Sequence, residues 1–585
     1  MRRMNITQRA GLALLAWSWL SPATLGQDGT PLPRLGGDLQ GQAPQNGNQN
    51  WPDIQAPANN PFVPSTNNPF FPRPGTNTDA RRVLGKALFW EEQVSSDNTM
   101  ACGTCHAPAF GGIDMRLTFP SPIGTEGSLG MVPQDSGNRF MPEAQLVQDR
   151  RVTPLAPAST VTGAAFKTSS FWDGRMGPSF LASDGSVLLD NWAALEAQAV
   201  LPPVNSIEMC RDGFTWNAGT STDSVAGKLG PARPLALATD LPQDLLDLQA
   251  DYATYAEAFD ATFAGTPYAG PDGVTRERFA MAIATYERTL VPNQAPIDLL
   301  DIDALDMAAV DASPKRGFEL FVSSDCDQCH SDANTGRSPM PFGLKPGGGF
   351  TNPFDSLLSD GLRRNDVGVP GTTAFESSVG TEEATGVVTP SLRNVALKRR
   401  FFHNGSLDSL EDVIRFYNGE IPGSAPNYRF FPALQTEQDH KDVRAFFETL
   451  TDPRVANGDP PFDRPTLYSE RVPHGSNEYG NPTPVTGPEL IANSPLLDGD
   501  MHFKIGLKDA PISSAGFLGV STTPASGPLV WIGSAGLSLI PITTDANGLA
   551  TYAVGPLPAG LTGLTVYAQA WVAGQFSGAA EWTFH

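Results

Sequence analysis

The chain reads LGKALFWEEQVSSDNTMACGTCHAPAFGG at residues 84–112 and KRGFELFVSSDCDQCH at residues 315–330. Both stretches contain the pattern Cys-x-x-Cys-His, formed by Cys102, Cys105 and His106 and by Cys326, Cys329 and His330. Two cysteines three residues apart can form thioethers with the two vinyl groups on one edge of a haem, and the histidine that follows can bind the iron. We therefore predict two covalently bound haem c groups, with a histidine from each motif as iron ligand.

Zinc binding and thiol redox chemistry are the alternative uses of these cysteines. Four cysteines and two histidines could hold zinc, but the two pairs are more than 200 residues apart, in separate helical segments. A thioredoxin-like dithiol would need a βαβ pattern, which surrounds neither pair. Chance gives one such motif in about a thousand chains, so two copies argue against coincidence.

The bulk composition indicates a multidomain protein that does not bind nucleic acid. A chain of 585 residues predicts two to four domains, and its 58 Gly and 53 Pro predict long connections between short helices. The formal charge of −23 excludes binding driven by phosphate neutralisation. An acidic surface could instead steer a basic partner.

The N-terminus has the features of an export signal. Arg2 and Arg3 precede a short apolar run at residues 10–20, and small residues at Thr24 and Gly26 suit cleavage before Gln27. We expect a periplasmic or secreted protein without a transmembrane anchor, since no later stretch reaches about 18 apolar residues. An uncleaved anchor is the alternative.

The expected fold is mainly α, with two cytochrome c-like haem domains followed by a small all-β, sandwich-like module. Residues 244–263, 276–290 and 315–322 have helical patterns. Thr436 offers an N-cap to a helix whose apolar face comprises Val443, Phe446, Phe447 and Leu450. We expect a signal peptide at 1–26, a Pro/Asn/Gln/Gly-rich linker at 27–78, haem domains at 79–300 and 301–452, a linker at 453–498 and the β module at 499–585.

Residues 80–452 resemble the bacterial diheme cytochrome c peroxidases and the related MauG enzymes. The resemblance rests on the order of several motifs, which are the two haem motifs, FWDGR (171–175), QAVLPPVNSIEM (198–209), AIATYERTL (282–290) and TPSLRNVALKRRFFHNGSLDSLEDVIRFY (389–417). Each motif besides Cys-x-x-Cys-His is weak alone, but their joint order makes coincidence implausible.

The resemblance assigns roles to individual residues. It implies that His106 binds the peroxide-reducing haem and His330 the electron-transfer haem, and that Trp172 lies between them. Gln198, Pro202 and Glu208 match residues over the open face of the first haem. Cleavage of peroxide needs a group that takes a proton from one oxygen and returns it to the other, which suits Glu208. The plain alternatives are a capping or surface glutamate and a core tryptophan.

Histidine is scarce outside the two motifs, where only His403, His440, His474, His502 and His585 remain. Many members of the family carry a histidine that blocks the first iron, and no histidine follows the first motif before His330. We therefore predict an open first site, with Met115 or Met131 as alternative ligands.

Several further positions carry expectations of their own. The resemblance to MauG implies that Tyr417 binds the second iron, where other members have methionine; a packed tyrosine with Met340 as ligand is the alternative. Arg393 could pair with a haem propionate or form a surface ion pair. The run Leu397-Lys398-Arg399-Arg400 argues against the calcium ion that many members bind there. Cys210 is expected to be a buried, inert thiol.

Three functions remain open at this point. The first is reduction of hydrogen peroxide to water with electrons from a small cytochrome c or cupredoxin. The second is a MauG-like, peroxide-dependent oxidation of Trp or Tyr in a partner protein, which Tyr417 favours. The third is a non-catalytic electron-transfer or haem-sensor protein, against which Glu208 and Gln198 argue. The chain could also form a homodimer.

Overall fold

The computed structural model describes the chain from residue 77 to residue 584, with interruptions. The described residues are 77–114, 128–137, 139–141, 150–151, 164, 170–171, 176–177, 179–189, 193–217, 223–290, 292, 294–296, 312–324, 326, 363–365, 386–388, 390–402, 405, 407–420, 434–471, 477–479, 487–492, 503–525, 530, 532–554 and 560–584. The predicted signal peptide and the linker up to residue 76 lie outside them. No helix in this described part is long and apolar enough to cross a bilayer.

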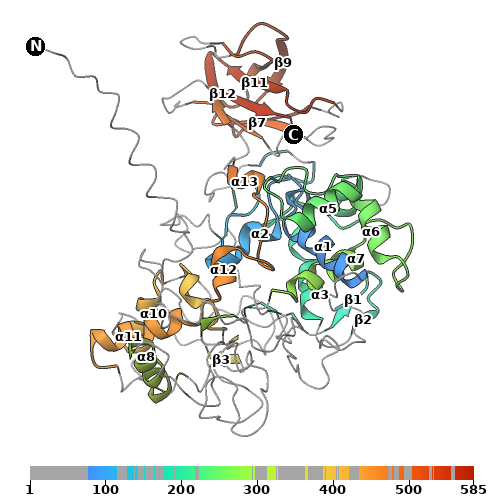
Figure 1. Cartoon of the computed structure of the whole chain (residues 1–585). Coiled ribbons are helices and arrows are strands. Elements are labelled where there is room, and N and C mark those ends of the chain that lie inside the picture. The colour runs from blue at the N-terminus through green and yellow to red at the C-terminus, as the bar shows by residue number, and fades with distance from the viewer. Residues whose placement is uncertain are drawn as a thin grey trace, which may run out of the picture.

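Helices dominate the chain up to residue 471 and strands dominate after it (Figure 1). The α-helices are α1 (Asn77–Phe89), α2 (Cys102–Cys105), α3 (Ala194–Ala199), α4 (Val225–Leu229), α5 (Gln243–Asp251), α6 (Tyr255–Phe263), α7 (Arg276–Glu287), α8 (Ala312–Ser323), α10 (Leu410–Tyr417), α11 (Glu437–Glu448), α12 (Pro453–Asn457) and α13 (Tyr468–Arg471). The 3₁₀ turns are η3 (Glu92–Val94), η4 (Pro108–Phe110), η6 (Pro202–Val204) and η10 (Val395–Leu397). The strands are β1 (Phe180–Leu181), β2 (Val187–Leu189), β3 (Arg363–Asn365), β4 (Gly386–Val388), β5 (Asn477–Tyr479), β6 (Glu489–Ala492), β7 (Lys504–Lys508), β8 (Ala515–Ser521), β9 (Ser538–Thr543), β10 (Ala550–Ala553), β11 (Thr565–Val572) and β12 (Gln575–Thr583).

The first helical unit, residues 77–290, is built around the crossing of α1 over α7. A Cβ atom at Gly85 would lie 1.9 Å from the carbonyl oxygen of Ala282, so only glycine lets the two helices approach this closely. Aromatic side chains complete the contact, because Phe89 packs edge-on against both Trp90 and Tyr286. The core continues into α5 and α6.

The second helical unit, residues 312–450, repeats this arrangement with α8 and α11. A Cβ atom at Gly317 would lie 1.8 Å from the carbonyl oxygen of Asp442. Phe321 of α8 packs against Phe446 and Phe447 of α11. In both units, therefore, the helix before a Cys-x-x-Cys-His motif crosses the unit's last long helix at a glycine (Figure 1).

The helices expected at 276–290 and 315–322 are confirmed as α7 and α8, the expected helix after Thr436 is confirmed as α11, and one other helix is predicted only in part. Thr436 caps α11 with a capping box, and the four apolar residues of its expected face are buried. The helix expected at 244–263 is interrupted, because the chain is extended at Tyr252 and restarts at Thr254, whose hydroxyl accepts a hydrogen bond from the Glu257 backbone. Residues 252–254 thus separate α5 from α6.

Residues 453–471, at the start of the stretch expected as a linker at 453–498, pack on the first helical unit, which corrects that boundary. Val455, Phe462 and Leu467 are buried in the core of the first helical unit. The Glu92 carboxylate accepts hydrogen bonds from the backbone of Tyr468 at 2.7 Å and of Ser469 at 2.9 Å. These contacts could not be predicted from the sequence, because the stretch is mostly polar and only a few apolar residues make them.

The C-terminal module is an antiparallel sandwich that begins at β5, earlier than the expected residue 499. One sheet has the strand order β10-β7-β6 and the other has the order β5-β12-β11-β8-β9. Their facing sides share one apolar core. The smaller sheet also contacts the first helical unit, through Lys504 to the Gly137 carbonyl at 3.2 Å and through Thr551, which accepts from the Phe140 backbone at 3.1 Å.

We predict that Gly85→Ala lowers the free energy of unfolding by at least about 2 kcal/mol, because the new methyl group forces α1 away from α7. Urea unfolding of the haem-loaded protein measures the effect. Gly177→Ala is the matched control, since nothing lies within 4 Å of its Cβ position. Equal unfolding midpoints for the two variants would contradict the assigned role of Gly85.

Candidate functional site

The first Cys-x-x-Cys-His motif forms the short helix α2 and the residue that ends it. The His106 backbone donates to the Cys102 carbonyl at 3.0 Å and closes the helical turn. Residues three apart on a helix share one face, so Cys102 and Cys105 lie on the same side of α2. Both cysteines and His106 are partly exposed. This donor set fits a haem, because two thiols and one imidazole meet at a single helical turn.

The position of α2 depends on the indole of Trp90. A Cβ atom at Gly103 would lie 2.2 Å from the Trp90 ring, so the indole packs directly on the backbone of the motif. The indole nitrogen faces the Tyr286 hydroxyl of α7 at 3.4 Å, and the Arg464 guanidinium covers the ring. The first helical unit thereby fixes the orientation of the helix that presents Cys102.

Two carboxylates act electrostatically on this motif. Burial, and then the negative charges of Glu287 and Glu208, raise the pKa of the Cys102 thiol to about 12. The structure therefore brings the predicted proton carrier Glu208 near the first haem motif, although the two are 106 positions apart in the sequence (208 − 102). It also brings Glu287 there, which sequence reasoning missed.

Glu287 is a buried acid at the end of α7. Burial raises its pKa to about 8, against the opposing effect of Arg288. Its Oε2 atom has no hydrogen-bond partner among the described residues. We expect the side chain to hold a proton at neutral pH, because an unpaired charge is costly in an apolar interior. A glutamate within the apolar run AIATYERTL is the sequence signal that could have revealed it.

Gln198 lies near the end of α3, and a buried ion pair holds that helix in place. Two nitrogens of Arg288 contact the two oxygens of Glu196 at 2.7 and 2.8 Å, and both side chains are almost fully buried. This bidentate pair joins α3 to the turn after α7. Gln198 itself is half-buried, and the Val200 carbonyl beyond it accepts the indole hydrogen of Trp216 at 2.8 Å.

Glu208 lies in a turn that is held on two sides. Asn205 organises the turn, since its carbonyl accepts from the Glu208 backbone at 3.1 Å and its side chain accepts from Ile207 at 2.9 Å. The loop at residues 129–131 pairs with the turn, and a Cβ atom at Gly130 would lie 1.7 Å from the Ile207 carbonyl. A fixed backbone suits a residue that must meet a bound substrate.

Two sulfur-bearing residues flank this turn. Met131, named above as an alternative iron ligand, is buried, and its backbone donates to the Ile207 carbonyl at 3.2 Å. Cys210 is buried as expected, and burial raises the pKa of its thiol to about 12. Such a thiol is largely protonated at neutral pH and therefore a poor nucleophile.

Several predicted site residues lie outside the described part of the chain. They are Trp172, Cys329, His330, His403, Met115 and Met340. Cys326 is described and packs at the edge of the second unit's core. The assignments of Trp172, Cys329 and His330 stay predictions.

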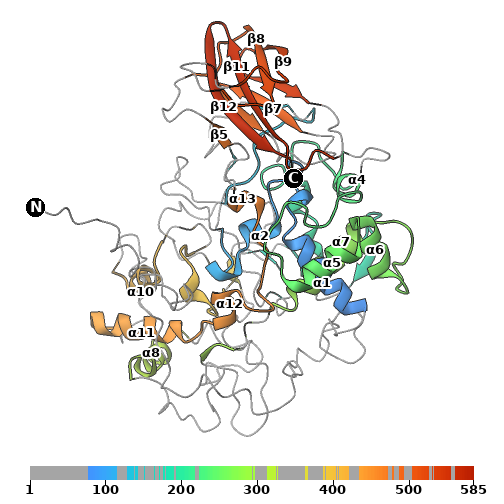
Figure 2. The same cartoon turned by 45° about the horizontal axis from the view of Figure 1, so that its top comes forward.

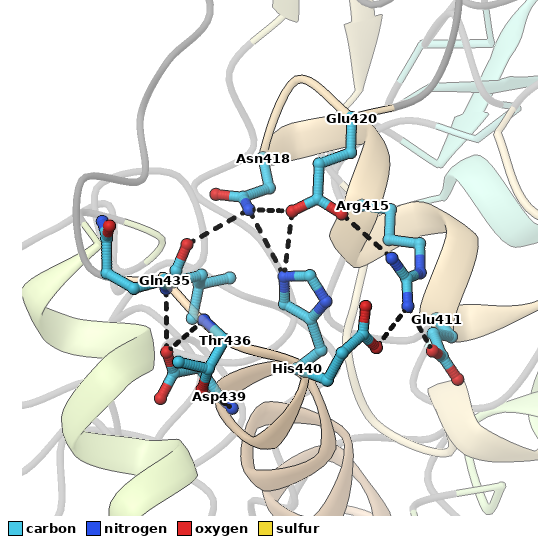
Figure 3. A network of polar contacts seen from close by, with 10 residues as sticks. Glu411, Arg415, Asn418, Glu420, Gln435, Thr436, Asp439 and His440 are labelled. Atoms are coloured by element: carbon cyan, nitrogen blue, oxygen red, sulfur yellow. Dashed lines mark hydrogen bonds and ion pairs between the residues drawn. The ribbon is translucent and has the colours of Figure 1, made fainter.

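Tyr417 is the last residue of α10 and lies at the edge of the second core. Its ring is half-buried and packs edge-on against Phe402 and Phe416. The C-cap residue Asn418 is held by polar contacts to the Leu434 carbonyl at 3.2 Å, to His440 Nε2 at 3.3 Å and to Glu420 (Figure 3). These contacts fix the end of α10, and with it the backbone of Tyr417.

The same network ties α10 to the start of α11. Arg415 of α10 pairs with Glu411, Glu420 and Glu437 (Figure 3). These carboxylates raise the pKa of Arg415, chiefly through the hydrogen bond to Glu437, and Arg415 in turn lowers the pKa of Glu437. The exposed pairs contribute little singly, but together they orient the two helices.

Arg393 and the basic run that follows it join the two helical units. Arg393 is buried, and it donates to the Pro292 carbonyl at 2.9 Å. The Arg399 guanidinium lies 5.3 Å from the centre of the Phe110 ring, just beyond the first haem motif. The methylene chain of Lys398 lies over Gly111. These two cations contact the first unit directly.

The chain is similar to known proteins over its first helical unit and beyond it. The model of the family "Di-haem cytochrome c peroxidase" matches residues 79–302. The chain is 28% identical over 340 residues to cytochrome c peroxidase Ccp of Escherichia coli, covering 58% of this chain and 53% of that protein. It is 28% identical over 381 residues to the methylamine utilization protein MauG of Methylophilus methylotrophus, covering 64% and 80%. It is 29% identical over 338 residues to cytochrome c551 peroxidase of Pseudomonas aeruginosa, covering 58% and 71%.

Solved structures of similar proteins include a MauG-like protein associated with microbial copper homeostasis, at 18% identity and a TM-score of 0.38, covering 67% of this chain and 97% of that one. The diheme peroxidase BthA of Burkholderia thailandensis is similar at 19% identity and a TM-score of 0.36, covering 66% and 88%.

We predict that Arg288→Met lowers the free energy of unfolding by about 3–5 kcal/mol, because it leaves Glu196 buried without its partner. Chemical unfolding measures the loss, and the added substitution Glu196→Leu should recover most of it. Arg139→Met is the control, since Arg139 forms an exposed pair with Asp135 that should contribute under about 1 kcal/mol. A similar loss in the two arginine variants would contradict a structural role for the buried pair.

Proposed function

We propose that residues 79–302, which match the model of the di-haem cytochrome c peroxidase family, form a domain of that family, and that the protein binds two haem c groups covalently and reduces hydrogen peroxide to water. The observation that carries this proposal is the contact between the turn of Glu208 and the segment that leads into the first haem motif. The Ser96 backbone donates to the Met209 carbonyl at 3.0 Å, and the Arg211 backbone donates to the Ser96 hydroxyl at 2.9 Å. A reaction on peroxide needs a proton carrier at that position.

In this proposal Cys102, Cys105 and His106 hold the peroxide-reducing haem, and Cys326, Cys329 and His330 hold the second. When bound, the first haem would supply the redox chemistry for the reduction of peroxide. Tyr417 would bind the second iron, and Arg393 would donate to a haem propionate.

In this proposal, side chains over the first haem transfer the proton and orient the peroxide. Glu208 would accept a proton from one oxygen of peroxide and return it to the other, which leaves as the first water. The second oxygen becomes the second water with two electrons from the redox partner and two protons from solvent. Gln198 can donate an amide hydrogen to the bound oxygen and orient it. The ion pair between Glu196 and Arg288 acts through α3, and it is a positioning contact for Gln198.

The second haem would receive electrons from a small cytochrome c or cupredoxin, and Trp172 would pass them to the first. An exported chain suits this partner, because c-type haem attachment and such donors belong outside the cytoplasm. We therefore propose a periplasmic or secreted enzyme, released from its signal peptide at residues 1–26. The acidic chain, with a formal charge of −23, favours a donor with a basic surface.

The second candidate is a MauG-like oxidase that uses peroxide to oxidise Trp or Tyr in a partner protein. Tyr417 favours it, because a phenolate ligand stabilises ferric iron and lowers the reduction potential. The fixed end of α10 supports a ligand at this position.

We predict that Glu208→Gln lowers kcat for peroxide reduction by about 100-fold or more, because the amide cannot carry the proton. Steady-state oxidation of reduced cytochrome c by peroxide measures the rate, and the haem absorbance should stay unchanged. Glu319→Gln is the matched control, since Glu319 is exposed on α8.

An unchanged kcat in Glu208→Gln would contradict the assigned proton carrier. Slow turnover of the wild type with cytochrome c, together with oxidation of a co-expressed protein, would favour the MauG-like function. No reaction with peroxide would leave a non-catalytic electron-transfer or haem-sensor role.

A further inference from the structure

The outer face of the larger sheet in the C-terminal module carries a row of ring side chains. Phe517 of β8 is opposite Trp571 of β11 and Pro541 of β9, and Trp571 is opposite Phe576 of β12. Opposed residues in an antiparallel sheet share one face, so these four residues form a continuous row across four strands. We name this row, which comprises three aromatic rings and the ring of Pro541, the aromatic stripe.

Alternation along the strands shows which face carries the aromatic stripe. Leu518, Ala570 and Ile540, each adjacent to a stripe residue, belong to the core between the two sheets. The stripe residues therefore point outward. Phe517 is 44% exposed and Trp571 38% exposed, which is high for rings of this size.

The aromatic stripe is open although the area beside it is covered. A Cβ atom at Gly519 would lie 2.6 Å from Cδ1 of Ile532, so Ile532 folds over that part of the face. The Phe517 and Trp571 rings lie nearly parallel, with 17° between their planes and 6.3 Å between their centres. Leu539, 63% exposed, extends the apolar area on β9.

The face is uncharged on β8, β9 and β11, and on β12 it carries the carboxylate of Glu581, opposite Tyr567. Its outward positions on β8, β9 and β11 are Ala515, Phe517, Gly519, Ser521, Leu539, Pro541, Thr543, Thr565, Tyr567, Gln569 and Trp571. The rest of the protein is strongly acidic, so an uncharged face does not select a charged partner. It also lacks the lysines and arginines with which proteins bind anionic membranes.

The module contacts the helical units through its other sheet. The contacts of Lys504 and Thr551 to the first unit come from β7 and β10. Both views place β9 on the side of the module away from the helices (Figures 1 and 2). A redox partner on this face would be separated from both helical units by the sandwich, which argues against an electron donor there.

We propose that the aromatic stripe binds a neutral, insoluble polysaccharide and so holds the enzyme on such a surface. Pyranose rings present flat C–H faces without charge, and these stack on aromatic rings and lose water in doing so. A neighbouring hydroxyl group, that of Thr543, is exposed on the same face and can bond the sugar hydroxyls. The proposal is independent of the chemistry at the haem motifs.

The test is binding of the full-length, haem-loaded protein to microcrystalline cellulose and to chitin, measured by depletion from solution. We expect retention on at least one of them, and a partition constant lower by about tenfold or more in Phe517→Ser/Trp571→Ser. The control Leu181→Ser/Val187→Ser removes two hydrophobic side chains of equal or greater exposure from β1 and β2 and should bind as the wild type does. All three proteins should keep the same thermal midpoint and peroxide turnover.

The proposal would be overturned if the wild type bound neither cellulose nor chitin. It would also be overturned if the variant Phe517→Ser/Trp571→Ser were retained as strongly as the wild type. Sedimentation velocity separates a further outcome. A wild type that dimerises and a stripe variant that does not, with no difference on the polymers, would assign the face to a second copy of the chain instead.

Discussion

The packing of the Trp90 indole on Gly103 is the contact on which the proposed haem site depends. Gly85 lets α1 lie close against α7, and α1 delivers Trp90 at its end. The indole then sets the plane of α2, which presents two thiols and an imidazole. A haem bound through three residues of one helical turn would tolerate little displacement of that turn. The proposed chemistry therefore depends on the crossing of α1 and α7.

Motif spacing and apolar periodicity predicted much of this architecture. The face of α11 and its Thr436 cap followed from a 3.6-residue period, because packing and capping there agree. The break at residues 252–254 and the ordered stretch at 453–471 could not be read in this way. The first depends on a capping hydroxyl within an apolar run, and the second on a few long-range contacts such as that of Glu92 with Tyr468. The same limit hid Glu287 and the pair of Glu196 with Arg288, since only the fold brings α3 and α7 together.

The two helical units share a construction but differ in electrostatics. The first buries Glu287, whose Oε2 has no hydrogen-bond partner in the described part of the chain, and the ion pair of Glu196 with Arg288, whereas α10 and α11 of the second carry an exposed network around Arg415. Low polarity around the first motif strengthens each charge that approaches it. This contrast agrees with the proposed roles of the two units, in which the first transfers protons and the second receives electrons.

Haem stoichiometry tests the central claim most directly. The mature protein should give a pyridine haemochrome spectrum equal to two haem c per chain, and the pigment should stay with the polypeptide in acidified acetone. Replacement of Cys326 and Cys329 by alanine should leave one haem per chain. A colourless protein, or one whose pigment passes into the acetone, would contradict covalent attachment at both motifs and the function proposed from it.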